Sequence, residues 1–129
     1  MSIERTFLDS QMDSQIKKLW KIAENKPVID IPVKTLEISH KKRHWACKLG
    51  KPISAFEVLQ NPSRAPEHAK KTEKASLDYP IILAASNLDI LDGLHRLNKS
   101  ILLGRTDIKA QLVSVSDLKK DVYVNKKVD

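Results

Sequence analysis

The spacing of apolar residues changes near position 92, where it predicts that a strand gives way to a helix. Ile90 and Leu91 are adjacent apolar residues of the kind found in a short buried strand. From residue 93 to about residue 103, apolar residues recur at helical spacing, which is typical of a helix with one face against a core. The residues expected on this face are Leu94, Leu97, Ile101 and Leu102.

Two residues mark the junction between this strand and this helix. Asp92 carries a carboxylate that can accept a hydrogen bond from an early helix N–H, so we expect it to cap the helix. Gly93 lacks a Cβ, which permits a tight turn and lets a ligand approach the backbone. Gly104 is expected to end the helix.

The rest of the chain alternates between helical and strand patterns. Helices are predicted over 9–25, 52–61 and 66–75, with a short last helix capped by Ser116 or Asp117. Strands are predicted over 28–38, 79–85, 88–91 and 108–115, with a hairpin turn at Ser86-Asn87. The fold class is therefore α+β, with a small mixed or antiparallel sheet and helices packed against it. One compact domain is expected, with an N-terminal helical segment (1–27), a main part (28–115) and a short C-terminal extension (116–129).

Three local patterns refine these elements. Ser54 and Glu57 have the Ser-x-x-Glu spacing of a capping box, which predicts a helix start. Pro32 has no backbone N–H, so it favours an edge strand or the beginning of a strand. The helix over 66–75 is rich in Lys and Glu, so we expect it to be exposed, with His68 as a surface residue.

The composition excludes several classes of protein. Of the 129 residues, 41% are hydrophobic, and no apolar run approaches the length of a membrane span. No secretory signal is visible at the N-terminus. Cys47 is the single cysteine, which excludes an internal disulfide and fits a reducing, cytoplasmic compartment. His40 and His44 are candidate metal ligands, but no Cys or carboxylate pattern beside them completes a site.

The charge balance points towards partners that carry phosphate. Lys and Arg total 23 against 16 Asp and Glu, which gives a formal net charge of +7. Such a charge suits a nucleotide or a nucleic acid, although solubility alone explains dispersed lysines equally well. Lys41, Lys42 and Arg43 follow the first predicted strand as a basic segment that could hold phosphates. The competing interpretation is a solvated loop that Trp45 anchors to the core.

The start of the helix after Gly93 is the strongest candidate site. Early helical N–H groups and the positive end of the helix dipole attract anions, phosphate above all. Gly93 would admit a phosphate to the backbone, His95 would donate a hydrogen bond or act as acid–base, and Arg96 would pair with phosphate oxygens. Asp92 could cap the helix, hold a magnesium ion, or both. The structural alternative is that these residues only cap, turn and face solvent.

This stretch resembles the signature of the ParB/sulfiredoxin superfamily. The resemblance is carried by Asp92-Gly93-Leu94-His95-Arg96, with Tyr79-Pro80-Ile81-Ile82 before it and Gly104 and residues 108–113 after it. It covers residues 79–113 well and 28–114 loosely. It implies the same α+β architecture and a site at this motif for the phosphates of ATP or CTP.

Departures from particular members narrow what the resemblance implies. Sulfiredoxins carry a catalytic Cys where Leu94 stands, so sulfiredoxin chemistry is not expected here. Partition proteins have a Gly-Glu-Arg-Arg motif that matches only Gly93 and Arg96, and this chain lacks room for their further domains. The superfamily's ATP-dependent free-serine kinases have an Asp-Gly-x-His-Arg motif that matches four residues here. They use a glutamate as general base, for which Glu37 is a candidate and Glu57 a poorer one.

Two classes of function stay open from the sequence. The first is a domain that binds a nucleotide, ATP or CTP with Mg²⁺, and that could transfer a phosphoryl group to a small hydroxyl substrate. The second is a ParB-type module that binds DNA or resembles a nuclease, with Lys41, Lys42 and Arg43 as accessory cations. We favour the first because it rests on a motif, whereas the second rests on diffuse charge. No membrane partner is expected.

Overall fold

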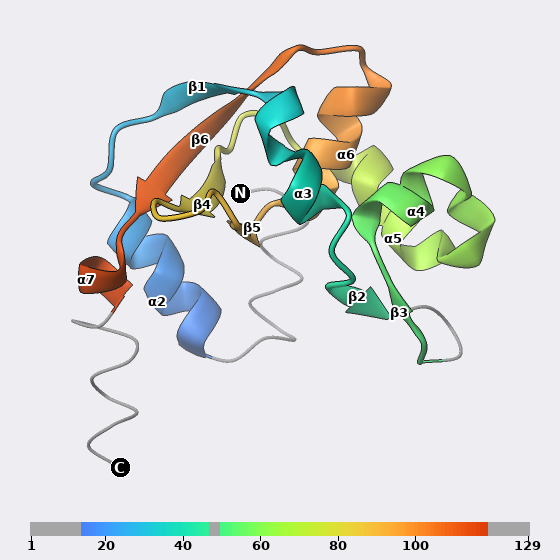
Figure 1. Cartoon of the computed structure of the whole chain (residues 1–129), viewed down its shortest axis with the longest axis horizontal. Coiled ribbons are helices and arrows are strands. Elements are labelled where there is room, and N and C mark those ends of the chain that lie inside the picture. The colour runs from blue at the N-terminus through green and yellow to red at the C-terminus, as the bar shows by residue number, and fades with distance from the viewer. Residues whose placement is uncertain (1–13, 47–49, 119–129) are drawn as a thin grey trace.

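The computed structural model describes residues 14–46 and 50–118. Its centre is a four-stranded mixed sheet with the strand order β1-β6-β4-β5 (Figure 1). The central strands β4 and β6 are parallel, and each pairs with an antiparallel edge strand. A second sheet consists of the two short antiparallel strands β2 and β3. The strands are β1 (Ile29–Pro32), β2 (Trp45–Ala46), β3 (Pro52–Ile53), β4 (Ile81–Ala84), β5 (Ile90–Asp92) and β6 (Asp107–Val113).

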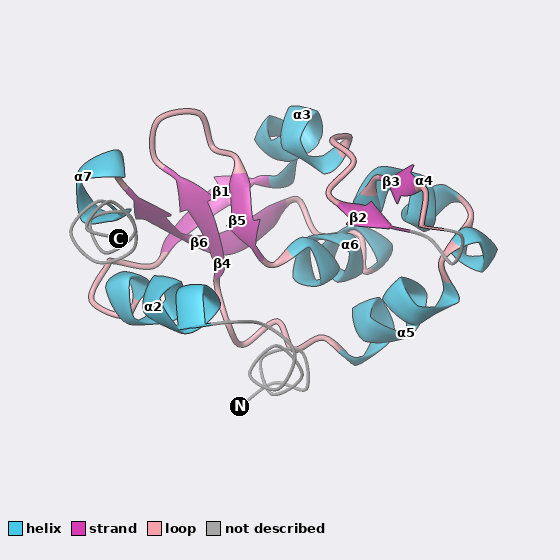
Figure 2. Cartoon of the chain, turned by 90° about the horizontal axis from the view of Figure 1, so that it is seen from below, coloured by secondary structure: helices cyan, strands magenta, loops and turns pink. Residues whose placement is uncertain are grey.

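Helices cover both faces of the main sheet, which makes the fold a small mixed α+β domain. Figure 2 shows α2 along one side of the sheet, and α6 packs on the other side. The helices are α2 (Ser14–Ala23), α3 (Glu37–His40), α4 (Ala55–Gln60), α5 (Pro66–Lys74), α6 (Leu94–Leu102) and α7 (Val115–Leu118), with the 3₁₀ turns η1 (Val33–Leu36) and η2 (Pro62–Arg64). No helix in the described ranges has both the length and the apolar character needed to cross a membrane.

Successive residues of β4 point to opposite faces of the sheet, so they belong to two separate hydrophobic clusters. Ile81 and Leu83 belong to the larger cluster, which includes Leu94 and Leu97 of α6. Ile82 points to the other face and packs with Leu19 and Ala23 of α2. Because successive strand residues face opposite sides, a buried strand with both faces covered reads as a continuous apolar run. The N-terminal helix is therefore packed on the sheet, as expected.

A smaller cluster lies beside the sheet, under α4 and α5. Its buried residues are Ile53, Val58 and Ala65, and the indole of Trp45 packs against both this cluster and the main core. Polar contacts join the region to α6, because Lys99 Nζ donates to the carbonyls of Glu73 and Ala75 at the end of α5. Trp45 thus anchors the segment before it to the core, as the competing interpretation of the basic segment expected.

The largest error in the predicted elements lies between residues 28 and 38. A strand was expected over this whole range, but β1 ends at Pro32 and residues 33–40 are helical. Pro32 supplies no N–H for further pairing, and its carbonyl accepts a hydrogen bond from Thr35 Oγ1. Pro32 does lie on an edge strand, as predicted.

Most other elements are confirmed with shifted ends. The β4–β5 hairpin, α5 and the Ser54–Glu57 capping box all form, although the helix of the box begins at Ala55 because Pro52–Ile53 is strand. Ser114, rather than Ser116 or Asp117, lies at the start of α7, where its hydroxyl accepts from Asp117 N–H. The predicted helix over 9–25 is seen over Ser14–Ala23, and residues 9–13 and 119–129 lie outside the described part.

Candidate phosphate site at the start of helix α6

Gly93 forms the junction between β5 and α6, and two features of its environment require glycine. Its φ is 116°, in the left-handed region that L side chains rarely adopt. A Cβ at this position would lie 2.4 Å from Cγ2 of Ile81. Gly93 is also the N-cap of α6, so the first turn begins without a capping side chain. The turn was predicted, and the packing against Ile81 was not visible in the sequence.

Asp92 does not cap α6, which corrects the sequence-based prediction. It is the last residue of β5, opposite Ile82, and its side chain is 4% exposed. Oδ2 accepts hydrogen bonds from Trp20 Nε1 at 2.9 Å and from Arg96 Nη2 at 3.0 Å. A magnesium ion usually keeps several water ligands, which a carboxylate buried in this way does not admit. The geometry therefore does not fit a magnesium site at Asp92.

Arg96 is buried, although the sequence placed it on the exposed side of the helix. Its side chain is 0% exposed, and the guanidinium pairs with Asp92, four residues earlier at the end of β5. The expectation that Leu102 faces the core was also wrong, because Leu102 is 65% exposed. Both errors have the same cause: residues 94–98 at the start of α6 are all buried whatever their polarity, whereas the end of the helix at Leu102 is exposed.

His95 lies in the first turn of α6 within an aromatic cluster. Its Nε2 is 3.0 Å from Nδ1 of His68, and its ring stacks on Trp45 with centroids 4.5 Å apart. His68 also stacks on Trp45, at 4.0 Å, and the two histidine centroids are 5.2 Å apart. Rings on opposite faces of the indole would be much farther apart, so both histidines lie on one face of Trp45. Trp45 and His68 together cover His95, which is 9% exposed.

His68 is the residue that the sequence reading missed. It was predicted to be a surface residue of a Lys- and Glu-rich helix, but it is half-buried and touches both His95 and Trp45. Burial, followed by the nearby charges of His95 and Lys71, lowers the pKa of His68 to about 4. Its position on the same face of α5 as Ala65 and Thr72, three residues before it and four after it, was the available signal.

The basic segment lies beside α6, but its three cations already have anionic partners. Lys41 pairs with Glu37 at 3.6 Å. Lys42 pairs with Asp89 at 2.8 Å, and Arg43 pairs with Glu57 at 3.1 Å. All three side chains remain exposed to solvent. The charge of the segment is therefore largely compensated.

The two histidines that flank the basic segment have different environments. His40 is buried, its Nε2 lies 2.6 Å from Asn98 Oδ1 of α6, and its ring packs edge-on to Phe56. Burial is the main cause that lowers the pKa of His40. His44 is exposed. Within residues 14–46 and 50–118, no group of three or more His, Cys, Asp or Glu residues could hold a metal ion.

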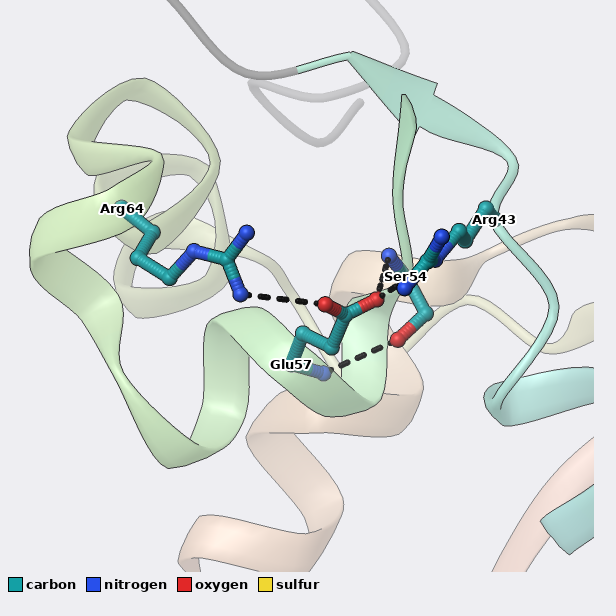
Figure 3. Close-up of polar contacts among 4 residues, drawn as sticks. All are labelled: Arg43, Ser54, Glu57 and Arg64. Atoms are coloured by element: carbon teal, nitrogen blue, oxygen red, sulfur yellow. Dashed lines mark hydrogen bonds and ion pairs between the residues drawn. The ribbon is translucent and has the colours of Figure 1, made fainter. Parts of the chain in front are cut away.

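The two candidate general bases lie on different elements, and neither has a recorded contact with His95. Glu37 is on α3 rather than at the end of a strand, and it is exposed and paired with Lys41. Glu57 accepts from the Ser54 N–H and binds Arg43 and Arg64, which approach its carboxylate from opposite sides (Figure 3). The bond from the Ser54 backbone is the largest cause that lowers the pKa of Glu57 to about 2. Glu57 is therefore a structural anchor and a weak base.

No protein-family model, curated protein sequence or solved structure matches this chain. The resemblance to the ParB/sulfiredoxin superfamily consequently remains an expectation based on residues 79–113. The small mixed sheet agrees with the α+β class that was predicted. A function has to be inferred from the arrangement of the described residues.

Proposed function

We propose that this protein binds a nucleotide, ATP or CTP, through its phosphates at the first turn of α6. One observation carries the proposal: a buried strand leads through a left-handed glycine directly into a helix whose N-cap has no side chain. The N–H groups of such a turn and the positive end of the dipole favour a phosphate. His95, within that turn, adds a side chain that can donate to a phosphate oxygen.

The surrounding residues have distinct roles in this proposal. Arg96 is buried, and its ion pair with Asp92 connects the first turn of α6 to the end of β5. It is a positioning residue and not the direct phosphate ligand that the sequence suggested. Trp45 and His68 cover His95, so a ligand reaches the first turn when these rings move aside. Lys42 and Arg43 are exposed and can exchange their carboxylate partners for phosphate.

The reaction class that suits such a site is transfer of a phosphoryl group to a small hydroxyl substrate. That reaction depends mainly on positioning and charge neutralisation. Asp92 already accepts hydrogen bonds from Trp20 and Arg96, so it is not a magnesium ligand in this proposal. Binding is therefore the part of the proposal to test first.

Calorimetric titration with ATP and with CTP tests the proposal, using wild type, His95→Ala and the control His44→Ala. A hydrogen bond to a charged group contributes about 1.5–3 kcal/mol, so loss of His95 should weaken binding roughly ten- to a hundredfold. His44 is exposed and outside the ring cluster, so its removal should change affinity little. The proposal fails if wild type binds neither nucleotide at about millimolar concentration.

A nucleic-acid-binding role is the second candidate, and it now rests on different residues. Lys17 and Lys21 of α2 and Lys70 and Lys74 of α5 are exposed and have no ion pair in the described part of the chain. Both helices lie along the same side of the molecule in Figure 2. A duplex-DNA binding assay titrated with salt tests it, because phosphate contacts make affinity fall steeply with salt concentration. Changing these four lysines to Gln should flatten that dependence, whereas an unchanged slope excludes this surface.

A further inference from the structure

A groove of about 630 Å³ lies at the opposite end of α6 from the candidate phosphate site. Three parts of the chain line it: β1, the residues just before β4, and the connection from α6 into β6. Its size falls within the range of pockets that hold small molecules. The lining residues on which the inference depends are Asp30, Asp78, Ser100, Arg105, Asp107 and Lys109.

The charged side chains of this groove are not paired with one another. Asp30 and Lys109 are direct partners across the β1–β6 pair, at a separation where opposite charges often meet. Nevertheless, neither these two nor Asp78, Arg105 and Asp107 form a side-chain hydrogen bond or an ion pair with any residue that the structure describes. This differs from the basic segment, where all three cations are paired. The groove therefore contains three carboxylates and two cations that have no partner among the described residues and can bind a ligand.

A buried hydroxyl among the lining residues also lacks a partner within the described part of the chain. Ser100 is 1% exposed, and its Oγ has no hydrogen-bond partner among the described residues. A helical Ser often donates to the carbonyl four residues earlier, but Ser100 does not form this bond. Leaving a buried polar group without a partner is unfavourable. A polar ligand in the groove would supply an acceptor or donor near this hydroxyl.

We propose that this groove binds a small zwitterion with one ammonium and one carboxylate group, the chemistry of a free amino acid. The carboxylates of Asp30, Asp78 and Asp107 would take the ammonium group, and Arg105 and Lys109 would take the carboxylate. A phosphate or another multiply charged anion would be repelled by the three aspartates, and a diamine would leave Arg105 and Lys109 without an anionic partner. This inference is independent of the nucleotide proposal, because the two sites share no residue.

The test uses the ¹⁵N-labelled 129-residue chain and records backbone amide shifts during titration with L-serine and with glycine. Ethanolamine and glycolate are the probes with a single charged group. We expect a zwitterion to shift the amides of residues 104–109 and to bind more tightly than either single-charge probe. Arg105→Gln and Asp107→Asn should each weaken this binding roughly tenfold, since each removes a charge-assisted contact. Lys51→Gln and Glu67→Gln, both at exposed positions outside the groove, are the matched controls.

The possible results separate cleanly. Shifts confined to the groove and lost in the two groove variants, but not in the controls, support the inference. It is overturned if no zwitterion binds by about 10 mM, if ethanolamine or glycolate binds equally well, or if the shifts map to residues 93–96. Amide spectra of the unliganded variants verify that each remains folded, and both groove substitutions are at exposed positions.

Discussion

Arg96 Nη2 donates to Asp92 Oδ2 at 3.0 Å, and both side chains of this pair are buried. The pair spans the turn at Gly93 and links the last residue of β5 to the first turn of α6. Trp20 Nε1 donates to the same carboxylate oxygen and so connects α2 to the pair. The distant helix α2 thus meets the consecutive elements β5 and α6 at one carboxylate, which explains why a charged residue lies in the core.

Arg96→Ala should therefore destabilise the fold, not only the candidate site. Removing one partner from a buried ion pair leaves the other charge uncompensated and costs about 3–5 kcal/mol of unfolding free energy. Arg105→Ala is the matched control, because Arg105 is exposed and should change stability by about 0.5 kcal/mol or less. Urea denaturation of both variants measures the difference. A small effect of Arg96→Ala would mean that the guanidinium does not hold α6 against β5.

Gly93→Ala should be more destabilising than Gly104→Ala, although both positions have a left-handed φ. The backbone strain of an L residue, about 1–2 kcal/mol, applies to both substitutions. At Gly93 the new methyl group also meets Cβ and Cγ2 of Ile81, whereas nothing lies within 4 Å of the corresponding position at Gly104. Overpacking of this kind adds about 1–3 kcal/mol. Equal losses in thermal or urea denaturation would show that the core at Ile81 yields without cost.

The sequence predicted the elements around Gly93 well, because their signals are local. The apolar strand, the glycine and the helical spacing of Leu94 and Leu97 depend on residues close together in the chain. What it could not show was the direction of the polar side chains. Arg96 points inward because its guanidinium and the indole of Trp20, which lie 4 and 72 residues from Asp92 in the sequence, both donate to Oδ2 of Asp92.

The difference between local signals and contacts of distant residues also explains the other errors. Residues 33–38 alternate partly like a strand, yet Pro32 ends the pairing and the chain turns into a helix. His68 lies on a helix that looks solvated in sequence, and only the packing of α5 against α6 brings it to His95. Contacts between distant segments decide both cases; the spacing of His68 with Ala65 and Thr72 indicates its helix face but not the partner that it meets.

Ser54→Ala should weaken the start of α4. The Ser54 hydroxyl accepts from the Glu57 N–H at 3.0 Å, and loss of such a cap costs about 1 kcal/mol. Glu57→Gln should be milder, because Gln can still complete the box and the lost ion pairs with Arg43 and Arg64 are solvent-exposed. Urea denaturation of the two variants gives the comparison. The reverse order of effects would assign the stabilisation to the arginines.

The stability of the fold should depend on pH through His68. A histidine whose pKa is about 4 in the folded chain and about 6.5 in the unfolded chain binds fewer protons when folded. Its contribution to stability is complete above pH 6.5 and is lost progressively as the pH falls towards 4. His40 is shifted in the same direction by burial, so it adds to this loss. The contribution of Glu57 is lost at lower pH, because its pKa falls from 4.5 to about 2 on folding.

The interval between about pH 5 and 6.5 therefore isolates the histidines. Urea denaturation across this interval should show wild type losing stability as the pH falls, and His68→Gln should lose less. His44→Gln is the control, since His44 is exposed and outside the ring cluster, and it should keep the wild-type slope. If His68→Gln has the same slope as wild type, then the stability of the folded state does not depend on a neutral His68. That ring stacks on Trp45 and is hydrogen-bonded to His95. The cover over His95 would then tolerate a charge, and a phosphate bound beneath it would be retained more tightly at low pH.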